Sequence, residues 1–327
     1  MTDNFGQYAD AVQGAAMTFL KSGCSSHPWD IRQRRVGGTV LQFGMDGGAA
    51  VSHGVTDAAS TSLLMQVTGY DDRVSLDGML CPSCVLFVLP PACHFTVTRS
   101  GPLRWFSWSI PKGENIALRI VPPETAQNLL RTEKALVALQ EEDASRLRYA
   151  THKAICDPAS DSTEQSLFDE LERVWQRRVG ATSLPNETTR SAEQIVFRAL
   201  QFVQSRPDES IGIQALAEAG GVGYRTLLRA FERYLKLAPK HYLKLRQINN
   251  VYHAIRRCDG AQMLTDILYA HGVTEFGRFA GEYNSIFGEW PSTTLQRYRR
   301  TMIDRGPRDD GQPDGDALRA NALARFL

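Results

Sequence analysis

An internal repeat near the end of the chain constrains its fold more than any other feature. The stretch GVGYRTLLRAFERYLKLAPKHY, Gly221 to Tyr242, recurs as GVTEFGRFAGEYNSIFGEWPS, Gly272 to Ser292. Equivalent apolar and proline positions are offset by 51 or 52 residues, and they pair Val222 with Val273, Leu227 with Phe279, Phe231 with Tyr283 and Pro239 with Pro291. Such self-similarity indicates one supersecondary unit that occurs twice.

Each copy follows a short amphipathic segment. IGIQALAEAG places Ile213, Leu216 and Ala217 on one face, and QMLTDILYAHG does the same with Leu264, Ile267 and Leu268. A glycine then breaks the pattern before a second apolar period begins. Helix, glycine-containing turn and helix form the helix-turn-helix pattern, whose second helix can lie in the major groove of DNA.

The apolar period of each second helix predicts which side chains face outward. In the first copy these are Tyr224, Arg225, Thr226, Arg229 and Arg233. In the second they are Thr274, Glu275, Phe276, Arg278 and Glu282. Arginine reads guanine with two hydrogen bonds and threonine donates to phosphate, so these residues are candidates for DNA contacts, with Arg225, Arg229 and Arg278 first for base readout.

Residues from about Arg190 to Arg300 resemble the tandem helix-turn-helix domain of the AraC/XylS family of bacterial transcription regulators. The resemblance rests on IQALAEAGGVGYRTLLRAFERY, on Pro239 followed by HYLKLR and a long helix, and on TDILYAHGVTEFGRFAGEYNSIFGEWPS. It implies a sequence-specific DNA-binding regulator with double-stranded DNA and RNA polymerase as partners. The expectation that it is an activator also comes from this resemblance. The resemblance also implies a small-molecule effector at the N-terminal domain, a homodimer, and a rigid connecting helix, HYLKLRQINNVYHAIRR.

Four positions depart from the family pattern. Gly223 stands at a usual serine cap, Lys236 at a common glycine and Leu268 at a common alanine. Gly281 occupies a position that often carries a basic residue, which removes a possible phosphate contact. We therefore expect the second motif to bind DNA more weakly than the first, or mainly through shape. A helical protein-interaction module with degenerate DNA-binding helices is a further alternative.

The first half of the chain has a different texture. Residues 32–110 contain short β-branched and aromatic runs broken by Gly, Asp and Pro, which predicts an antiparallel sandwich or barrel. The resemblance implies a cupin-like fold for it. In LRWFSWSIP, strand alternation places Trp105 with Ser107 and Phe106 with Trp108, as core residues or as the lining of an apolar effector pocket. We expect Arg99 and Arg104 to be solvated edge charges, with pairing to a carboxylate effector as the alternative.

The sequence predicts an α+β protein with the following organisation. A regulatory and dimerisation domain spans residues 1–180, β-rich over 32–110 and helical over 124–180, where two amphipathic helices are expected. A polar linker at 181–193, the tandem helix-turn-helix domain at 194–300 and a mostly disordered tail at 301–327 follow it.

Charge and composition agree with a DNA-binding regulator. The formal net charge is only +1, but Arg190 to Arg300 holds 16 basic and 10 acidic residues. No apolar run approaches the ~20 residues that cross a bilayer, and the first residues have no basic and apolar export pattern. We expect a cytoplasmic protein without a membrane partner.

Three cysteines offer a rival interpretation. Cys81 and Cys84 have Cys-x-x-Cys spacing, and Cys93 with His94 would complete four zinc ligands. A redox- or metal-responsive protein is the alternative that they raise. The run VLFVLPP between them reads as a buried strand, however, and His27, His53 and His94 lie on separate segments. We expect small buried thiols, no metal, no cofactor and no catalysis.

Overall fold

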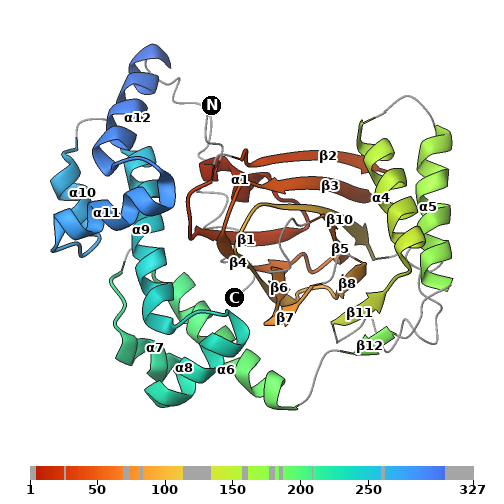
Figure 1. Cartoon of the computed structure of the whole chain (residues 1–327), viewed down its shortest axis with the longest axis horizontal. Coiled ribbons are helices and arrows are strands. Elements are labelled where there is room, and N and C mark those ends of the chain that lie inside the picture. Colours follow the sequence, from red (N-terminus) through yellow and green to blue (C-terminus); the bar gives the residue numbers. More distant parts are fainter. Residues whose placement is uncertain are drawn as a thin grey trace.

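Alternating apolar residues assemble the N-terminal half into two antiparallel sheets. The computed structural model describes residues 5–25, 27–68, 74–81, 84–112, 134–156, 161–176, 181–183, 187–207, 209–258 and 262–305. One sheet has the strand order β1-β4-β9-β6-β7, and the other has the order β12-β11-β8-β5-β10-β3-β2. The two sheets face each other, with helices on both outer sides (Figure 1).

The strands of the first sheet are β1 (Ala15–Lys21), β4 (Ala50–Thr56), β6 (Val74–Leu76), β7 (Met79–Leu80) and β9 (His94–Arg99). Those of the second are β2 (Asp30–Val36), β3 (Thr39–Asp46), β5 (Ser60–Thr68), β8 (Val85–Leu89), β10 (Leu103–Pro111), β11 (Ala135–Ala138) and β12 (Ala181–Ser183). Helix α1 (Phe5–Ala11) precedes them. The sandwich thus begins before residue 32, the expected start of the β-rich region. The sequence analysis missed α1 and β1 because each is only seven residues long.

Two helices cover the outer face of the second sheet. They are α4 (Glu141–Cys156) and α5 (Asp161–Gln176), and they bury Leu147, Leu167 and Leu171 against a core that contains Phe106 and Trp108. The prediction that 124–180 is helical is wrong at 135–138. Those residues form β11, which pairs with β8 and continues the sheet. Residues 113–133 lie outside the described part of the chain.

The C-terminal half is helical, which confirms the α+β class. Its helices are α6 (Glu187–Gln204), α7 (Ile213–Ala219), α8 (Tyr224–Tyr234), α9 (Pro239–Arg257), α10 (Leu264–Ala270), α11 (Phe276–Phe287) and α12 (Pro291–Arg305). The structure differs from the expected linker at 181–193, since β12 and the first residues of α6 occupy described parts of it. Helix α12 reaches Arg305, past the expected start of the tail, and residues 306–327 lie outside the described residues.

Candidate nucleic-acid interface

The first helix-turn-helix motif consists of α7, a tight turn and α8. Gly221 adopts φ +70° in the turn, a conformation that glycine takes without a side-chain clash. The amide of Val222 then donates to the carbonyl of Ala217, 3.1 Å away, which closes the end of α7. Helix α8 buries Leu227, Ala230, Phe231 and Tyr234, and it exposes all five predicted residues, Tyr224, Arg225, Thr226, Arg229 and Arg233.

The second motif repeats this construction in α10, its turn and α11. Gly272 adopts φ +68°, and the amide of Val273 donates to the carbonyl of Leu268 at 3.0 Å, the counterpart of the bond in the first motif. Phe279 and Tyr283 are buried, while Thr274, Glu275 and Arg278 are exposed.

Two predicted contacts of the second motif are less available than the sequence indicated. Phe276 is half-buried, and its ring meets that of Tyr269 edge-on at 4.9 Å. Glu282 is half-buried as well, and the Lys244 ammonium of α9 lies 2.7 Å from its carboxylate.

The two motifs differ in whether their exposed arginines form ion pairs with nearby carboxylates. Arg278 lies 3.2 Å from the carboxylate of Glu282 and 3.6 Å from that of Glu275. Burial would raise the pKa of Glu282, but the bonds and charges of Lys244 and Arg278 bring that pKa below its ordinary value, so the carboxylate stays charged. Among the described residues no carboxylate lies within ion-pair distance of Arg225 or Arg229. The first motif therefore presents the more available cations.

Helix α9 connects the two motifs and is fixed along its length. It buries Tyr242, Leu245, Ile248 and Val251. The buried guanidinium of Arg246 donates to a cluster of carbonyls at the end of α6 and just after it, including those of Pro207 and Glu209 at 2.8 Å each. Figure 1 shows α8 near one end of α9 and α11 near the other, so the length of α9 sets the distance between them.

The contacts between the sandwich and this helical unit include three sets of described residues. In the β6–β7 turn, buried Asp77 accepts hydrogen bonds from the Tyr234 hydroxyl of α8 at 2.6 Å and from the Lys134 ammonium at 2.6 Å. The side chain of Asn249 in α9 bonds both the amide and the carbonyl of Lys21 at 3.0 Å, as a neighbouring strand would. From α1, the ring of Phe5 lies 5.9 Å from that of Tyr252.

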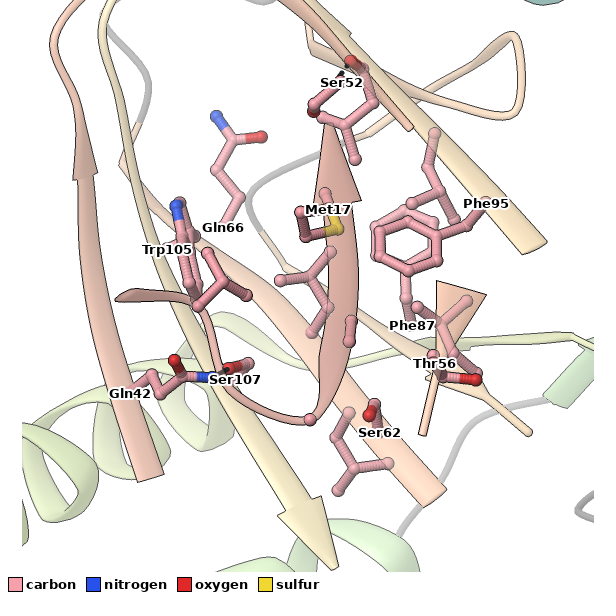
Figure 2. A pocket seen from close by; sticks show the side chains of 18 of the residues that line it. Met17, Gln42, Ser52, Thr56, Ser62, Gln66, Phe87, Phe95, Trp105 and Ser107 are labelled. Carbon is pink, nitrogen blue, oxygen red and sulfur yellow. Dashed lines mark hydrogen bonds between the residues drawn. The ribbon is translucent and has the colours of Figure 1, made fainter. Parts of the chain in front are cut away.

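A cavity of about 90 Å³ lies between the two sheets. Its lining includes Met17, Phe87, Phe95, Trp105 and Ser107, which Figure 2 shows around a common space. Trp105 and Ser107 thus share the inner face of β10, and Phe106 and Trp108 belong to the core under α4 and α5. This matches the predicted alternation.

The expectation that Arg99 is a solvated charge is wrong. Arg99 is 5% exposed and pairs with buried Asp46, with Nε 2.9 Å from a carboxylate oxygen. The hydroxyl of Tyr8 and the indole N–H of Trp105 bond the same carboxylate. Arg104 is exposed, as predicted. Sequence reasoning could not find the Arg99–Asp46 pair, because β3 and β9 belong to different sheets.

The cysteine environments do not favour redox chemistry. Burial raises the pKa of both the Cys81 and the Cys93 thiol to about 12, so thiolate is scarce at neutral pH. Cys84 donates to the carboxylate of Glu141. The described residues contain no group of three or more His, Cys, Asp or Glu placed to hold a metal ion. No helix among them is long and apolar enough to cross a membrane.

Known proteins match this chain at three levels, a family model, sequence relatives and solved structures. A family described as a helix-turn-helix domain matches residues 216–297. The XylDLEGF operon transcriptional activator 2 of Pseudomonas putida is 30% identical over 112 residues, which are 33% of this chain and 69% of that protein. Activator 3 of the same operon and organism is 31% identical over 108 residues, 33% of each chain, so this chain spans only a third of that relative's length.

A solved structure gives a similar match. It is described as a probable AraC family transcriptional regulator from Rhodopseudomonas palustris, and it is 28% identical to this chain, with a TM-score of 0.30. The match covers 32% of this chain and 97% of that one.

Proposed function

Because this chain belongs to the AraC/XylS family of transcription regulators, with a helix-turn-helix DNA-binding domain, we propose that it activates transcription from a promoter whose sequence it reads mainly through α8. One observation carries this proposal. Arg225, Arg229 and Arg233, four residues apart on α8, form a stripe of exposed cations on the face opposite its buried core. Guanine edges and phosphates are the groups that such a stripe fits.

The second motif has a supporting role in this proposal. Thr274 and Arg278 are exposed at the start of α11, but Glu275 and Glu282 compete with DNA for the Arg278 guanidinium. Breaking those two ion pairs costs free energy, which offsets part of the binding free energy that a contact between Arg278 and a phosphate contributes. We assign α11 to positioning on the backbone and to groove shape, and base readout chiefly to α8.

The remaining partners follow from the relatives and from the two halves of the fold. Two Pseudomonas putida relatives are named as transcriptional activators, which supports activation through RNA polymerase. We propose that residues 1–180 regulate and dimerise, that 194–300 bind DNA, and that the protein acts in the cytoplasm without a cofactor or a reaction of its own. A small-molecule effector bound in the sandwich would act through the Asp77, Asn249 and Phe5 contacts.

The experiment is a salt-dependent titration of the full chain against its own upstream DNA, with non-specific competitor. We expect competitor-resistant binding and a steep fall in affinity with salt, because phosphate neutralisation releases counterions. Arg229→Ala should weaken specific binding by about 1 to 3 kcal/mol. Arg32→Ala, an exposed arginine of the sandwich, is the matched control. Unchanged affinity in the Arg229 variant would remove that residue from the interface, and equal binding of competitor would refute sequence-specific reading.

A further inference from the structure

We infer that α11 recognises thymine, through apolar contact between the ring of Phe276 and the 5-methyl group that thymine presents in the major groove. The inference rests on the proposed function, and it adds a base-specific contact to the backbone positioning assigned to α11 above. Three observations carry it. The repeat replaces the arginines of α8 with glycines, the charged side chains near the start of α11 are paired with each other, and an aromatic pair occupies the N-terminal end of α11.

The internal repeat shows what α11 lacks. Both second helices begin with an aromatic residue, α8 with Tyr224 and α11 with Phe276, so the two helices align from their first residues. In this alignment two glycines replace the exposed first candidates for guanine readout, Gly277 for Arg225 and Gly281 for Arg229. The equivalent positions of α11 therefore offer neither a cation nor a side-chain hydrogen-bond donor.

The charged side chains near the start of α11 are paired with each other. The Arg278 guanidinium lies 3.2 Å from the carboxylate of Glu282 and 3.6 Å from that of Glu275. It has to leave these carboxylates before it can donate to a guanine. Contact with a methyl group needs no hydrogen bond, only apolar surface that fits against it. An apolar side chain at this end of α11 can therefore contact a base without breaking an ion pair.

The ring of Phe276 supplies that apolar surface. Phe276 is the first residue of α11, and the N-terminal residues of such a helix contact base edges. It is half-buried, and its ring lies edge-on to that of Tyr269 in α10, with 4.9 Å between the ring centroids. Tyr269, itself 64% exposed, packs against Phe276 and leaves part of it open to solvent. Next to it, a Cβ at Gly277 would meet no atom within 4 Å, so a base edge can come close to the helix.

The size of this patch favours a base over a protein. The rings of Phe276 and Tyr269 are far smaller than the ~800 Å² that each partner buries in a stable protein interface. One ring is enough for one methyl group. Thymine carries that methyl group in the major groove, whereas the other three bases present only hydrogen-bonding groups there. Apolar contact at Phe276 therefore selects thymine.

Replacement of thymine by deoxyuridine removes the 5-methyl group and leaves base pairing intact, so it tests this contact alone. Footprinting of the full chain on its own upstream DNA identifies the protected thymines, and each is then replaced singly. We expect one replacement to weaken specific binding by the unmodified chain about fourfold, the effect of burying one carbon group. In Phe276→Ala the same replacement should leave the affinity unchanged, because the ring that contacts the methyl group is gone.

Further variants serve as controls. Phe276→Leu keeps an apolar side chain at this position and should retain the sensitivity to deoxyuridine. Trp290→Ala removes another exposed aromatic residue, just beyond the opposite end of α11, and should retain that sensitivity too. Circular dichroism establishes that each variant is folded. If Phe276→Ala is not, Phe276→Gln, which keeps the length of the side chain but not its apolar surface, takes its place.

The outcomes separate this contact from the alternatives. If no replacement weakens binding by the unmodified chain, or if the loss is the same in Phe276→Ala, the inference is overturned. Loss of transcriptional activation in Phe276→Ala without any effect of deoxyuridine would assign the patch to a protein partner and overturn it as well. Specific binding without dependence on a methyl group leaves the proposed function standing, whereas upstream DNA that binds no more tightly than competitor refutes both.

Discussion

Lys236 and Gly288 occupy equivalent positions in the two copies of the repeat. Each follows the second helix of its motif, α8 or α11, which we call the recognition helices. Both have left-handed backbones, with φ +57° for Lys236 and +73° for Gly288. A residue with a Cβ pays roughly 1–2 kcal/mol for this conformation, and glycine does not. The chain therefore ends α8 with a strained residue where it ends α11 with an unstrained one. Lys236 is exposed, so its side chain contributes little packing in return.

Replacing Lys236 with glycine should stabilise the protein. We expect Lys236→Gly to raise the free energy of unfolding by about 1 kcal/mol, because relief of strain exceeds the extra entropy of glycine in the unfolded chain. Urea denaturation of the full chain measures the change. Lys236→Ala is the control, since it removes the same charge but keeps a Cβ. If both variants gained equally, loss of the charge rather than backbone relief would be the cause.

Helix α11 is the weaker recognition element under the proposed function, and its composition agrees with that proposal. It carries Gly277 in its first turn and Gly281 in its interior, where a glycine costs roughly 0.5–1 kcal/mol relative to alanine. A Cβ at Gly281 would meet no atom within 4 Å, so the position is open and exposed. Nothing in the packing of α11 requires glycine there.

A basic residue at Gly281 should strengthen DNA binding by α11. We expect Gly281→Lys to tighten binding and to steepen the dependence of log affinity on log salt by about one unit, since one more phosphate is neutralised. Gly281→Ala stabilises the helix by the same backbone effect but adds no charge, so its salt slope should match that of the unmodified chain. An unchanged slope in Gly281→Lys would place this face of α11 away from the phosphates.

Elements with local patterns were predictable, and those that depend on distant partners were not. The apolar pairs Leu227 with Phe231 and Phe279 with Tyr283 fixed the inner faces of both recognition helices, and the glycine turns marked their starts. Strand β11 was missed because the sequence ALVA fits a helical period equally well. It is a strand because it pairs with the edge of β8 that β5 leaves open, and that pairing is not visible in the local sequence. The Arg99–Asp46 pair was missed because it joins strands from two sheets, which no local spacing encodes.

At the scale of the whole molecule, the sandwich holds both DNA-binding motifs at once. Asp77 bonds Tyr234 at the end of α8, and Phe5 of α1 packs near Tyr252 and Phe287, whose rings stack at 4.3 Å. Under the proposed function α8 and α11 meet DNA together, so contacts that restrain both helices can set whether they do so. The proposed regulation by the sandwich therefore needs no direct contact between an effector and either α8 or α11.

The surroundings of His53 predict that the stability of this interface depends on pH. It lies on β4, 4% exposed, with its ring 6.3 Å from that of Tyr242 in α9, and neither ring nitrogen has a hydrogen-bond partner among the described residues. A small cavity beside it is lined also by His94, Glu193 and Tyr234. Lys134 donates a hydrogen bond to Glu193, and Tyr234 donates one to Asp77. Burial, with a smaller contribution from the charge of His94, lowers the pKa of His53 to about 4.

That lowered pKa predicts a loss of stability in mild acid. The unfolded chain protonates His53 near pH 6.5, but the folded chain does so only near pH 4, so its stability is complete above pH 6.5 and falls as the pH drops between those values. From pH 7 to pH 5 this one group should cost about 2 kcal/mol. Urea denaturation at both pH values, compared with His53→Leu, isolates it: the variant should be at least as stable at pH 7, because no hydrogen bond is lost, and should lose about 2 kcal/mol less on acidification. Equal losses in both proteins would mean that His53 is hydrated or bonded in solution.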